Sequence, residues 1–392
     1  MLSMPRTNGC RRGVARLQFR GLTRIKSARS RTSQIKSRVV AVTAGRYNPH
    51  PTVNMWELNV WILIVKTSSM GDVVHTLPAV TDAAGALPEV RFDWLVEDAF
   101  AEIPGWHHSV ERVIPVAIRR WRKRPWRSLV GGECRDFVRQ LRARKYDLVI
   151  DAQGLIKSSI LTRFVSAPVA GFARHSAREP LATLAYQTQV NVSREMHAVE
   201  RTRQLFAKVL GYPCPAASGD FGLQLSDFQK TSRPTRQIIF VHATTLPEKH
   251  WPEAYWRQLC QQLANSGFSV RLPWGTTTDR ERAVRIAQSH RQASVLPRLS
   301  LRELATELSA AQAVVAVDTG LGHLAAALGV PTVSLYGSTS PDRIGTYGAS
   351  QQHLCAKNFA GDENRATATS LEHVTPAIVR REVLRSVLRG AA

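Results

Sequence analysis

Residues 60–78 read Val60-Trp61-Ile62-Leu63-Ile64-Val65-Lys66-Thr67-Ser68-Ser69-Met70-Gly71-Asp72-Val73-Val74-His75-Thr76-Leu77-Pro78. The first six form an unbroken apolar run of strand length, which predicts a strand buried on both faces of a parallel sheet. Val73, Leu77 and Val80 recur at helical spacing, so a helix is expected to begin near Gly71. The polar loop between strand and helix then lies at the carboxyl end of the strand, where open α/β sheets bind ligands.

The same alternation continues through the first half of the chain. Strands are predicted at 91–96, 112–116 and 147–151, and helices over 133–144 and 198–210. Such alternation is typical of right-handed βαβ units and a parallel sheet. Residues 213–234 are rich in Pro and Gly and show little periodicity, so we expect a linker there.

After the linker the pattern starts again. Strands are predicted at 238–241, 268–272, 295–296, 313–317 and 332–336, and helices over 252–266, 278–289 and 300–310. The fold class is therefore α/β, with two doubly wound, Rossmann-like domains and a cleft between them. We place the N-terminal domain at 56–212 and the C-terminal domain at 235–392, with the last helix packing back on the N-terminal domain.

Residues 1–55 form a basic tail that accounts for about half of the net charge of +23. A disordered anion-binding arm, an organelle transit peptide and sequence upstream of the true start all fit this composition. We favour the last, because Met55 lies just before the first strand. No window of ~18 apolar residues predicts a transmembrane helix. Five dispersed cysteines (Cys10, Cys134, Cys214, Cys260 and Cys355) argue against a disulfide framework or a zinc site.

Two loops in the second half suit a nucleotide. Val317-Asp318-Thr319-Gly320-Leu321-Gly322-His323 follows a buried strand and opens a helix, whose first-turn N–H groups attract anions such as diphosphate. Asp318 and Thr319 would also serve as plain helix caps. Thr244, Thr245 and Lys249 follow another strand and can bind phosphate oxygens. The chain has no Gly-x-Gly-x-x-Gly at either loop, which disfavours a nicotinamide-dinucleotide enzyme.

Residues 117–127 contain six Lys and Arg and two Trp. Nucleic acid, a membrane surface and an acidic substrate are all compatible with this composition, as is a merely solvated loop. Residues 151–158 repeat the strand, loop and helix plan, either as a wall of the cleft or as a helix cap. His75, His175 and His197 are not spaced as a metal set, so no metal is expected.

Six motifs carry a resemblance to a known family. They are residues 66–78, Asp151-Ala152-Gln153-Gly154, Arg178-Glu179-Pro180, His197-Ala198-Val199-Glu200-Arg201-Thr202, His242-Ala243-Thr244-Thr245 and Val317-Asp318-Thr319-Gly320. Together they resemble the lipopolysaccharide heptosyltransferases of glycosyltransferase family 9, over about 60–388. The first loop resembles heptosyltransferase I more than heptosyltransferase II.

The resemblance implies an inverting, metal-independent glycosyltransferase of GT-B type that uses no cofactor. It would move L-glycero-D-manno-heptose from ADP-heptose to the first Kdo of Kdo2-lipid A. The N-terminal domain would bind the acceptor and the C-terminal domain the donor. It would act as a monomer, peripheral to the cytoplasmic face of the bacterial inner membrane, without a nucleic-acid partner.

The resemblance also assigns site residues. Asp72 matches the catalytic base, and Lys249 supports the departing diphosphate. Donor-binding residues are Thr244, Thr245, Lys249, Asp279, Leu299, Asp318, Thr319, Gly320 and His323. Charge and loop position, and not the resemblance, make candidates for acceptor binding of Lys66, Ser69, Arg119, Arg120, Arg122, Lys123 and Gln153. Asp279 stands where a Glu is common, and the shorter carboxylate weakens the expected ribose contact. Leu299 replaces a Met, an apolar exchange of small effect.

Two other classes remain open from the sequence. One is another sugar-nucleotide transferase of the same fold, heptosyltransferase II included. The other is a non-catalytic basic protein that binds membrane or nucleic acid. The second class would not need Asp72 and Asp318 on opposed domains.

Overall fold

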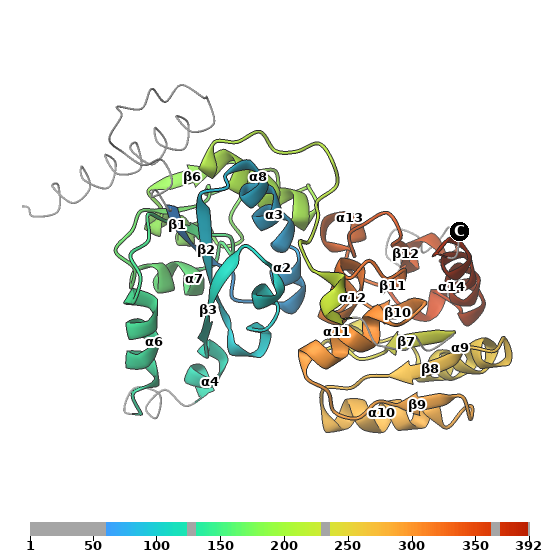
Figure 1. The fold of residues 1–392 in the computed structure, drawn as a ribbon. Coiled ribbons are helices and arrows are strands. Elements are labelled where there is room, and N and C mark those ends of the chain that lie inside the picture. Colours follow the sequence, from blue (N-terminus) through green and yellow to red (C-terminus); the bar gives the residue numbers. More distant parts are fainter. Residues whose placement is uncertain (1–59, 124–130, 229–235, 362–368, 391–392) are drawn as a thin grey trace, which may run out of the picture.

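The structure, a computed structural model, describes residues 60–123, 131–228, 236–361 and 369–390, so the basic tail lies outside the described residues. Two α/β domains lie side by side, each built on a six-stranded parallel sheet (Figure 1). This arrangement confirms the predicted fold class. None of the helices in the described ranges combines the length and apolarity that a membrane crossing requires.

The first sheet has the strand order β3-β2-β1-β4-β5-β6. Its strands are β1 (Val60–Val65), β2 (Val90–Glu97), β3 (Val110–Val116), β4 (Leu148–Asp151), β5 (Val169–Phe172) and β6 (Thr188–Val190). β1 pairs with β2 on one side and β4 on the other. Ile62 and Ile64 join the core on one face, and Leu63 and Val65 join the core on the other. Burial on both faces explains why β1 is continuously apolar.

Helices cover both faces of this sheet (Figure 1). They are α2 (Met70–Val74), α3 (Leu77–Ala86), α4 (Ile118–Lys123), α6 (Glu133–Arg142), α7 (Ile156–Thr162) and α8 (Ala198–Leu210), with the 3-10 turns η2 (Asp98–Phe100), η3 (Pro104–Trp106) and η4 (Pro180–Ala185). The helix expected from Gly71 onward is divided into α2 and α3. Pro78 fits the first turn of α3, where a missing N–H costs nothing.

The second sheet has the order β12-β11-β10-β7-β8-β9. Its strands are β7 (Gln237–Val241), β8 (Ser269–Leu272), β9 (Ala293–Val295), β10 (Ala313–Val317), β11 (Thr332–Tyr336) and β12 (Gln352–Cys355). Its helices and 3-10 turns are η6 (Pro247–Lys249), α9 (Glu253–Asn265), α10 (Thr277–Ala287), α11 (Leu301–Ser309), α12 (Gly320–Ala327), α13 (Pro341–Ile344), η7 (Ala356–Asn358), η9 (Leu371–His373) and α14 (Pro376–Gly390). β10 and β7 lie at the centre, so the two phosphate-loop candidates leave neighbouring strands.

Several expectations differ from the structure. β5, β6 and β12 have only three or four residues each and were not predicted. α14 does not return to the first domain as expected, because it packs on α9, β10 and β11 and its Val379 and Val383 belong to the second domain's core. The described cysteines, Cys134, Cys214, Cys260 and Cys355, are free thiols, which agrees with the expected lack of a disulfide framework.

The predicted linker is packed against both domains where it is described. Its short turn η5 (Leu225–Phe228) ends in a buried phenylalanine, whose ring lies 5.1 Å from the Trp106 ring of the first domain. The carbonyl oxygen of Phe228 accepts a hydrogen bond from Ser309 of the second domain at 2.6 Å. The chain therefore ties the domains together as it passes between them.

Close packing of α2 against α12 forms the contact between the domains nearest the cleft. Gly71 and Gly320 make this approach possible. A Cβ on Gly71 would lie 2.6 Å from His323 Cδ2, and one on Gly320 would lie 2.6 Å from Met70 Cβ. Neither position has room for a side chain as the domains stand.

Candidate active site

A cleft of about 740 Å³ opens between the two domains at the carboxyl ends of both sheets. Volumes of this size are usual for small-molecule sites. Eleven of the predicted site residues line it, namely Ser69, Asp72, Arg119, Thr244, Thr245, Lys249, Asp279, Asp318, Thr319, Gly320 and His323. The first three come from the N-terminal domain and the others from the C-terminal domain, so the fold brings the two halves of the predicted site together.

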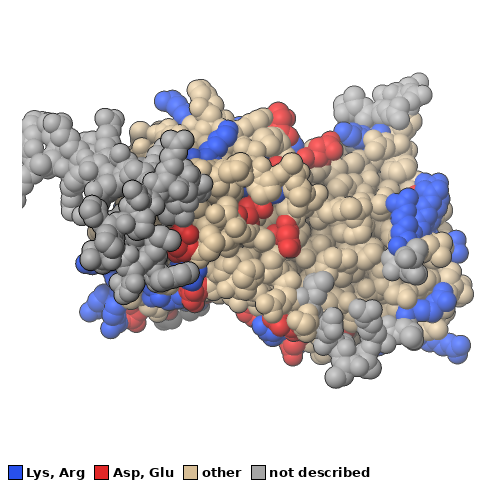
Figure 2. Space-filling view, turned by 45° about the horizontal axis from the view of Figure 1, so that its top comes forward, with Lys and Arg blue, Asp and Glu red and all other residues tan. Residues whose placement is uncertain are grey.

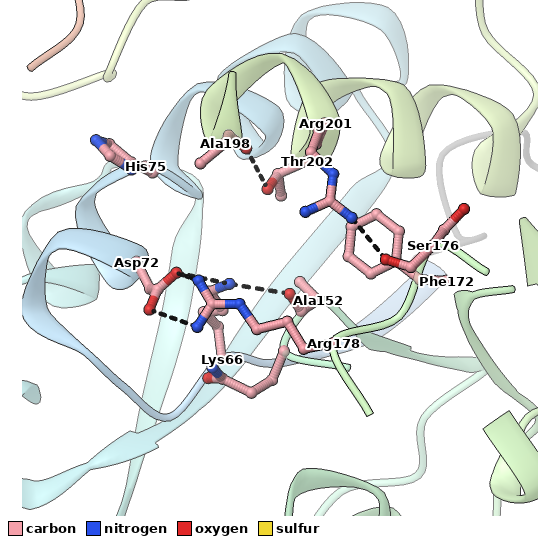
Figure 3. A pocket seen from close by; sticks show the side chains of 11 residues that line it. Lys66, Asp72, His75, Ala152, Phe172, Ser176, Arg178, Ala198, Arg201 and Thr202 are labelled. Carbon is pink, nitrogen blue, oxygen red and sulfur yellow. Dashed lines mark hydrogen bonds and ion pairs between the residues drawn. The ribbon is translucent and has the colours of Figure 1, made fainter. Parts of the chain in front are cut away.

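Asp72 lies at the centre of a charged cluster on the first-domain wall (Figure 3). Arg178 reaches across to it, with Nη2 2.8 Å from Oδ1 and Nη1 3.4 Å from Oδ2. Lys66 Nζ lies 3.6 Å from the same Oδ1. Burial opposes ionisation of Asp72, but the charges of Lys66 and Arg178 outweigh it and hold the pKa of Asp72 well below its usual range. The carboxylate is therefore ionised at neutral pH.

The backbone of the first loop also orients Asp72. The Ser69 N–H donates to Asp72 Oδ2 at 3.0 Å, as in a capping box at the start of α2. Gln153, two residues after β4, holds the same loop, since its Oε1 accepts from the N–H groups of Thr67 and Ser68. Ser69 and Gln153 thus position the loop that carries Asp72.

A small side pocket extends from Asp72 toward α8 (Figure 3). Lys66, Gln153 and Arg178 line it, together with Arg201. Gln153 is almost fully buried, and its Nε2 has no hydrogen-bond partner among the described residues. Lys66 is also buried, which lowers its pKa, and its Nζ donates to the carbonyl oxygen of Ala152 at 3.0 Å. The pocket therefore offers cationic groups and one unpaired amide donor next to a carboxylate.

Asp318 and Lys249 form the main polar contact on the second-domain wall. Lys249 Nζ lies 2.6 Å from Asp318 Oδ2, which also accepts from Thr339 Oγ1 at 2.8 Å. Burial opposes ionisation of Asp318, but its hydrogen bonds outweigh this effect and its pKa is lowered. Asp318 therefore fixes the Lys249 ammonium beside the first turn of α12. That turn has no side-chain cap from Thr319, and its Gly322 N–H donates to the Thr319 carbonyl oxygen. The N–H groups of Gly320 and Leu321 are therefore the ones left for an anion.

The other predicted donor residues line the cleft, with the exception of Leu299. Thr244, Thr245 and Gly320 line the cleft without taking part in the Lys249–Asp318 pair. Asp279 also lines it, and its Oδ2 accepts from the Thr276 N–H at 2.9 Å as the capping box of α10. Leu299 lies between β9 and α11 and is not among the residues that line the cleft.

The described part of the basic segment after β3 forms helix α4, and of its basic residues Arg119 alone lines the cleft. Arg119 lines the cleft, whereas Arg120 pairs with Asp98 and Glu133 away from it. Arg122 and Lys123 are exposed and are not among the lining residues. Trp121 packs on Phe137 within its own domain, so this tryptophan needs no external partner. Residues 124–127 lie outside the described residues.

Figure 2 shows how charge is spread over one face of the molecule. Lys and Arg side chains of the described residues gather mainly toward the two ends of this face.

Sequence reasoning missed two residues of this site. Arg178 lies in one of the quoted motifs, but the strand before it, β5, was not predicted, so its approach to Asp72 was not foreseen. His75 belongs to α2's C-terminus and contacts His323 of the other domain at 3.1 Å. The described residues contain no group of three or more His, Cys, Asp or Glu arranged to hold a metal ion.

Comparison with known proteins identifies the family. The family described as Glycosyltransferase family 9 (heptosyltransferase) matches residues 134–374. The chain belongs to glycosyltransferase family 9. It is therefore a glycosyltransferase, as the resemblance implied.

Individual relatives agree with this assignment. "Lipopolysaccharide heptosyltransferase 1" of Pseudomonas aeruginosa is 58% identical over 75% of this chain and 83% of the relative. The protein of the same name from Escherichia coli K12 is 51% identical over 74% of this chain and 92% of the relative. "Lipopolysaccharide heptosyltransferase 2" of Salmonella typhimurium is only 25% identical over 72% and 84%.

A solved structure confirms the GT-B fold. "E. coli heptosyltransferase WaaC with ADP" superposes with a TM-score of 0.77 at 46% identity, covering 83% of this chain and all of that chain, 100%. Ligands of open α/β sheets bind at the carboxyl ends of the strands, and the interdomain cleft lies at those ends of both sheets. The cleft that holds Asp72 and Lys249 is therefore the candidate active site.

Proposed function

We propose that this glycosyltransferase is a lipopolysaccharide heptosyltransferase of type I. It transfers L-glycero-D-manno-heptose from ADP-heptose to the first Kdo of Kdo2-lipid A. The observation that carries the proposal is the placement of Asp72 on one wall of a single cleft and the Lys249–Asp318 pair on the other. The greater identity to type 1 than to type 2 relatives favours the first reaction of the two.

The donor lies along the second-domain wall in this proposal. Thr244, Thr245 and Lys249 bind the diphosphate, and the N-terminus of α12 adds the partial positive charge of a helix end. Asp318, Thr319 and His323 contact the heptose and its adjacent phosphate. The solved relatives with ADP and with ADP-2-deoxy-2-fluoro heptose support a nucleotide-heptose donor.

Asp72 acts as general base on the acceptor. It removes the proton of the Kdo hydroxyl while that oxygen forms a bond to the anomeric carbon of heptose. The bond from that carbon to the β-phosphate oxygen breaks, and ADP leaves with the electron pair. Attack from the face opposite the leaving group inverts the anomeric configuration. Lys249 stabilises the negative charge that develops on the diphosphate.

The cations around Asp72 suit an acidic acceptor. They make Asp72 a weak base, because Lys66 and Arg178 stabilise its ionised form. A Kdo carboxylate that binds Arg178 would draw this guanidinium away and raise the basicity of Asp72 at the moment of transfer. Arg119 and the unpaired Gln153 Nε2 complete the polar lining on the acceptor side.

We further propose that the reaction uses no metal and no cofactor. Lys249 and the α12 N-terminus would supply the positive charge that a divalent ion supplies elsewhere. Transfer should therefore persist in EDTA. A loss of activity that magnesium restores would contradict this proposal.

The protein is also proposed to act as a monomer, peripheral to the cytoplasmic face of the inner membrane. The test of the function is mass-spectrometric detection of heptose addition to Kdo2-lipid A by purified protein. An acceptor that already carries one heptose is run in parallel, because a type II enzyme would prefer it. Other ADP-sugars serve as competing donors. Failure with Kdo2-lipid A and transfer to the heptosylated acceptor would assign type II activity instead.

A further inference from the structure

Most large exposed apolar side chains in the described part of the chain lie in one place. Seven large apolar residues are exposed in the described part of the chain, and five of them belong to α7, the turn after it, or η4. Leu184 is 82% exposed and Leu181 64%, both in η4. The five are Ile156, Ile160, Phe164, Leu181 and Leu184, which we call the apolar patch.

The five side chains share one surface. Ile156, Ile160 and Phe164 are spaced four residues apart, which places them on one side of α7 and its continuing turn. η4 packs directly against α7, so Leu181 and Leu184 extend the same surface. Their neighbours Leu161, Ala182 and Ala185 point inward and belong to the core of the first sheet. The apolar patch is therefore the solvent-facing side of α7 and η4, whose other side packs into the core of the first domain.

Basic groups border the apolar patch. Arg163 is exposed between Ile160 and Phe164, and Arg142 of α6 donates from Nε to the Phe164 carbonyl oxygen at 3.0 Å. Lys157 follows Ile156, and Arg178 precedes η4 by two residues. Apolar side chains with a basic border match an anionic lipid surface, which accepts both at once.

The apolar patch is continuous with the candidate acceptor site. Lys157 Nζ donates to Ser68 Oγ of the catalytic loop at 2.8 Å. The Ile156 N–H donates to Glu179 Oε2 at 2.6 Å, and the neighbouring Arg178 holds Asp72. A lipid-linked sugar that reaches Asp72 would therefore leave its acyl chains beside the patch.

We infer that the apolar patch is the face by which this protein docks on an anionic lipid bilayer. The inference rests on the proposed function, because it takes a membrane-embedded glycolipid as the acceptor. Docking by this face would bring the opening beside Asp72 to the headgroup level. A second copy of the chain fits less well, because a two-fold contact would bring the basic borders of two molecules together.

The test compares vesicle binding by the full chain and its variants. The double variant Leu181→Ser/Leu184→Ser removes two exposed side chains, and Leu388→Ser is the matched control because Leu388 is 72% exposed on α14 of the other domain. Wild type and control are expected to sediment with phosphatidylglycerol vesicles and poorly with phosphatidylcholine vesicles. The double variant should bind phosphatidylglycerol vesicles about tenfold more weakly.

Heptose transfer supplies a second readout. With acceptor in vesicles, kcat/KM of the double variant should fall with its vesicle binding. With a deacylated, water-soluble acceptor it should equal wild type, which also shows that the variant is folded. Unchanged vesicle binding by the double variant would overturn the docking face. So would a wild-type dimer in sedimentation without lipid that the double variant converts to monomer. Absence of transfer to either acceptor, with vesicle binding still dependent on Leu181 and Leu184, would refute the function and leave the docking face standing.

Discussion

His75 Nε2 lies 3.1 Å from His323 Nδ1, so one hydrogen bond joins the two domains at the wall of the cleft. His75 caps the C-terminus of α2, the short helix that contains Asp72. His323 lies in α12, and its Nε2 is 3.8 Å from Asp318 Oδ1. The rings meet edge to face, with centroids 4.5 Å apart. The pair therefore connects the loop of the proposed base to the loop of the proposed donor site.

This pair should make stability depend on pH. Burial and then the neighbouring His323 and His197 lower the pKa of His75 well below 6.5, while Asp72 raises it and Lys66 lowers it by smaller amounts. His75 therefore binds a proton more readily in the unfolded chain than in the folded one. As a result, the free energy of unfolding should fall as the pH falls below about 6.5. Above that pH the His75 side chain is neutral in both the folded and the unfolded chain, so it adds no pH dependence.

The free energy of unfolding is measured with denaturant at pH values between about 7.5 and 5, because histidines titrate in that range. His75→Gln should reduce the slope, and His175→Gln, at an exposed histidine, serves as the comparison. Other buried histidines keep part of the slope, since burial lowers the pKa of His107 to about 4. Equal slopes in wild type and His75→Gln would show that His75 contributes nothing.

Gly71→Ala should reduce transfer by disturbing the contact of α2 with α12. The new Cβ would lie 2.6 Å from His323 Cδ2, so either the ring or the domain must move. Gly85→Ala is the matched control, because nothing lies within 4 Å of its Cβ and alanine favours a helix by about 1 kcal/mol. We expect kcat/KM to fall for Gly71→Ala alone. Activity of Gly71→Ala equal to that of Gly85→Ala would mean that the contact tolerates a shift.

Asp72→Asn should abolish most turnover and leave donor affinity intact. The amide keeps the shape of the side chain but cannot accept a proton, and loss of a general base costs about 10²–10⁴-fold in rate. Single-turnover kinetics and calorimetric titration with ADP separate the two effects. An Asp72→Asn enzyme with wild-type kcat would remove Asp72 as the base.

Lys249→Ala should weaken ADP binding about 10- to 100-fold, the range for a lost hydrogen bond to a charged group. The change also leaves Asp318, which is nearly buried, without its closest partner. Lys357→Ala serves as the control, since Lys357 is an exposed lysine of the same domain that does not line the cleft. Unchanged ADP affinity in Lys249→Ala would dismiss its contact with the diphosphate.

Arg178→Ala should move the acid limb of the pH profile of kcat/KM to higher pH. Arg178 lowers the pKa of Asp72, so its removal raises that pKa and the base becomes protonated at a higher pH. Arg174→Ala, an exposed arginine four residues earlier, provides the comparison. If Arg178 only held the Asp72 loop in place, kcat/KM would fall equally at every pH and the acid limb of the profile would not shift.

Much of the architecture followed from local patterns. β1, α8, β10 and β11 match their predicted ranges residue for residue, because α8 is long and periodic and the three strands are mainly apolar runs of five or six residues. The short strands β5, β6 and β12 were missed, since a Gly, Gln or His interrupts each of them and leaves no clear apolar pattern. Without β5, nothing in the sequence placed Arg178 at the carboxyl edge of the first sheet.

By itself the sequence determined the α/β class, the two-domain order and the polar loops after β1, β7 and β10. These features depend on residues that are close together in the sequence. A run of apolar residues indicates a strand buried on both faces, and a polar loop before a helix indicates a phosphate site. Only the tertiary structure decided the partners of the proposed base. Arg178 is 106 residues from Asp72, and His323 is 248 residues from His75. Such pairs depend on strand order within a sheet and on how two domains pack, which no local pattern contains.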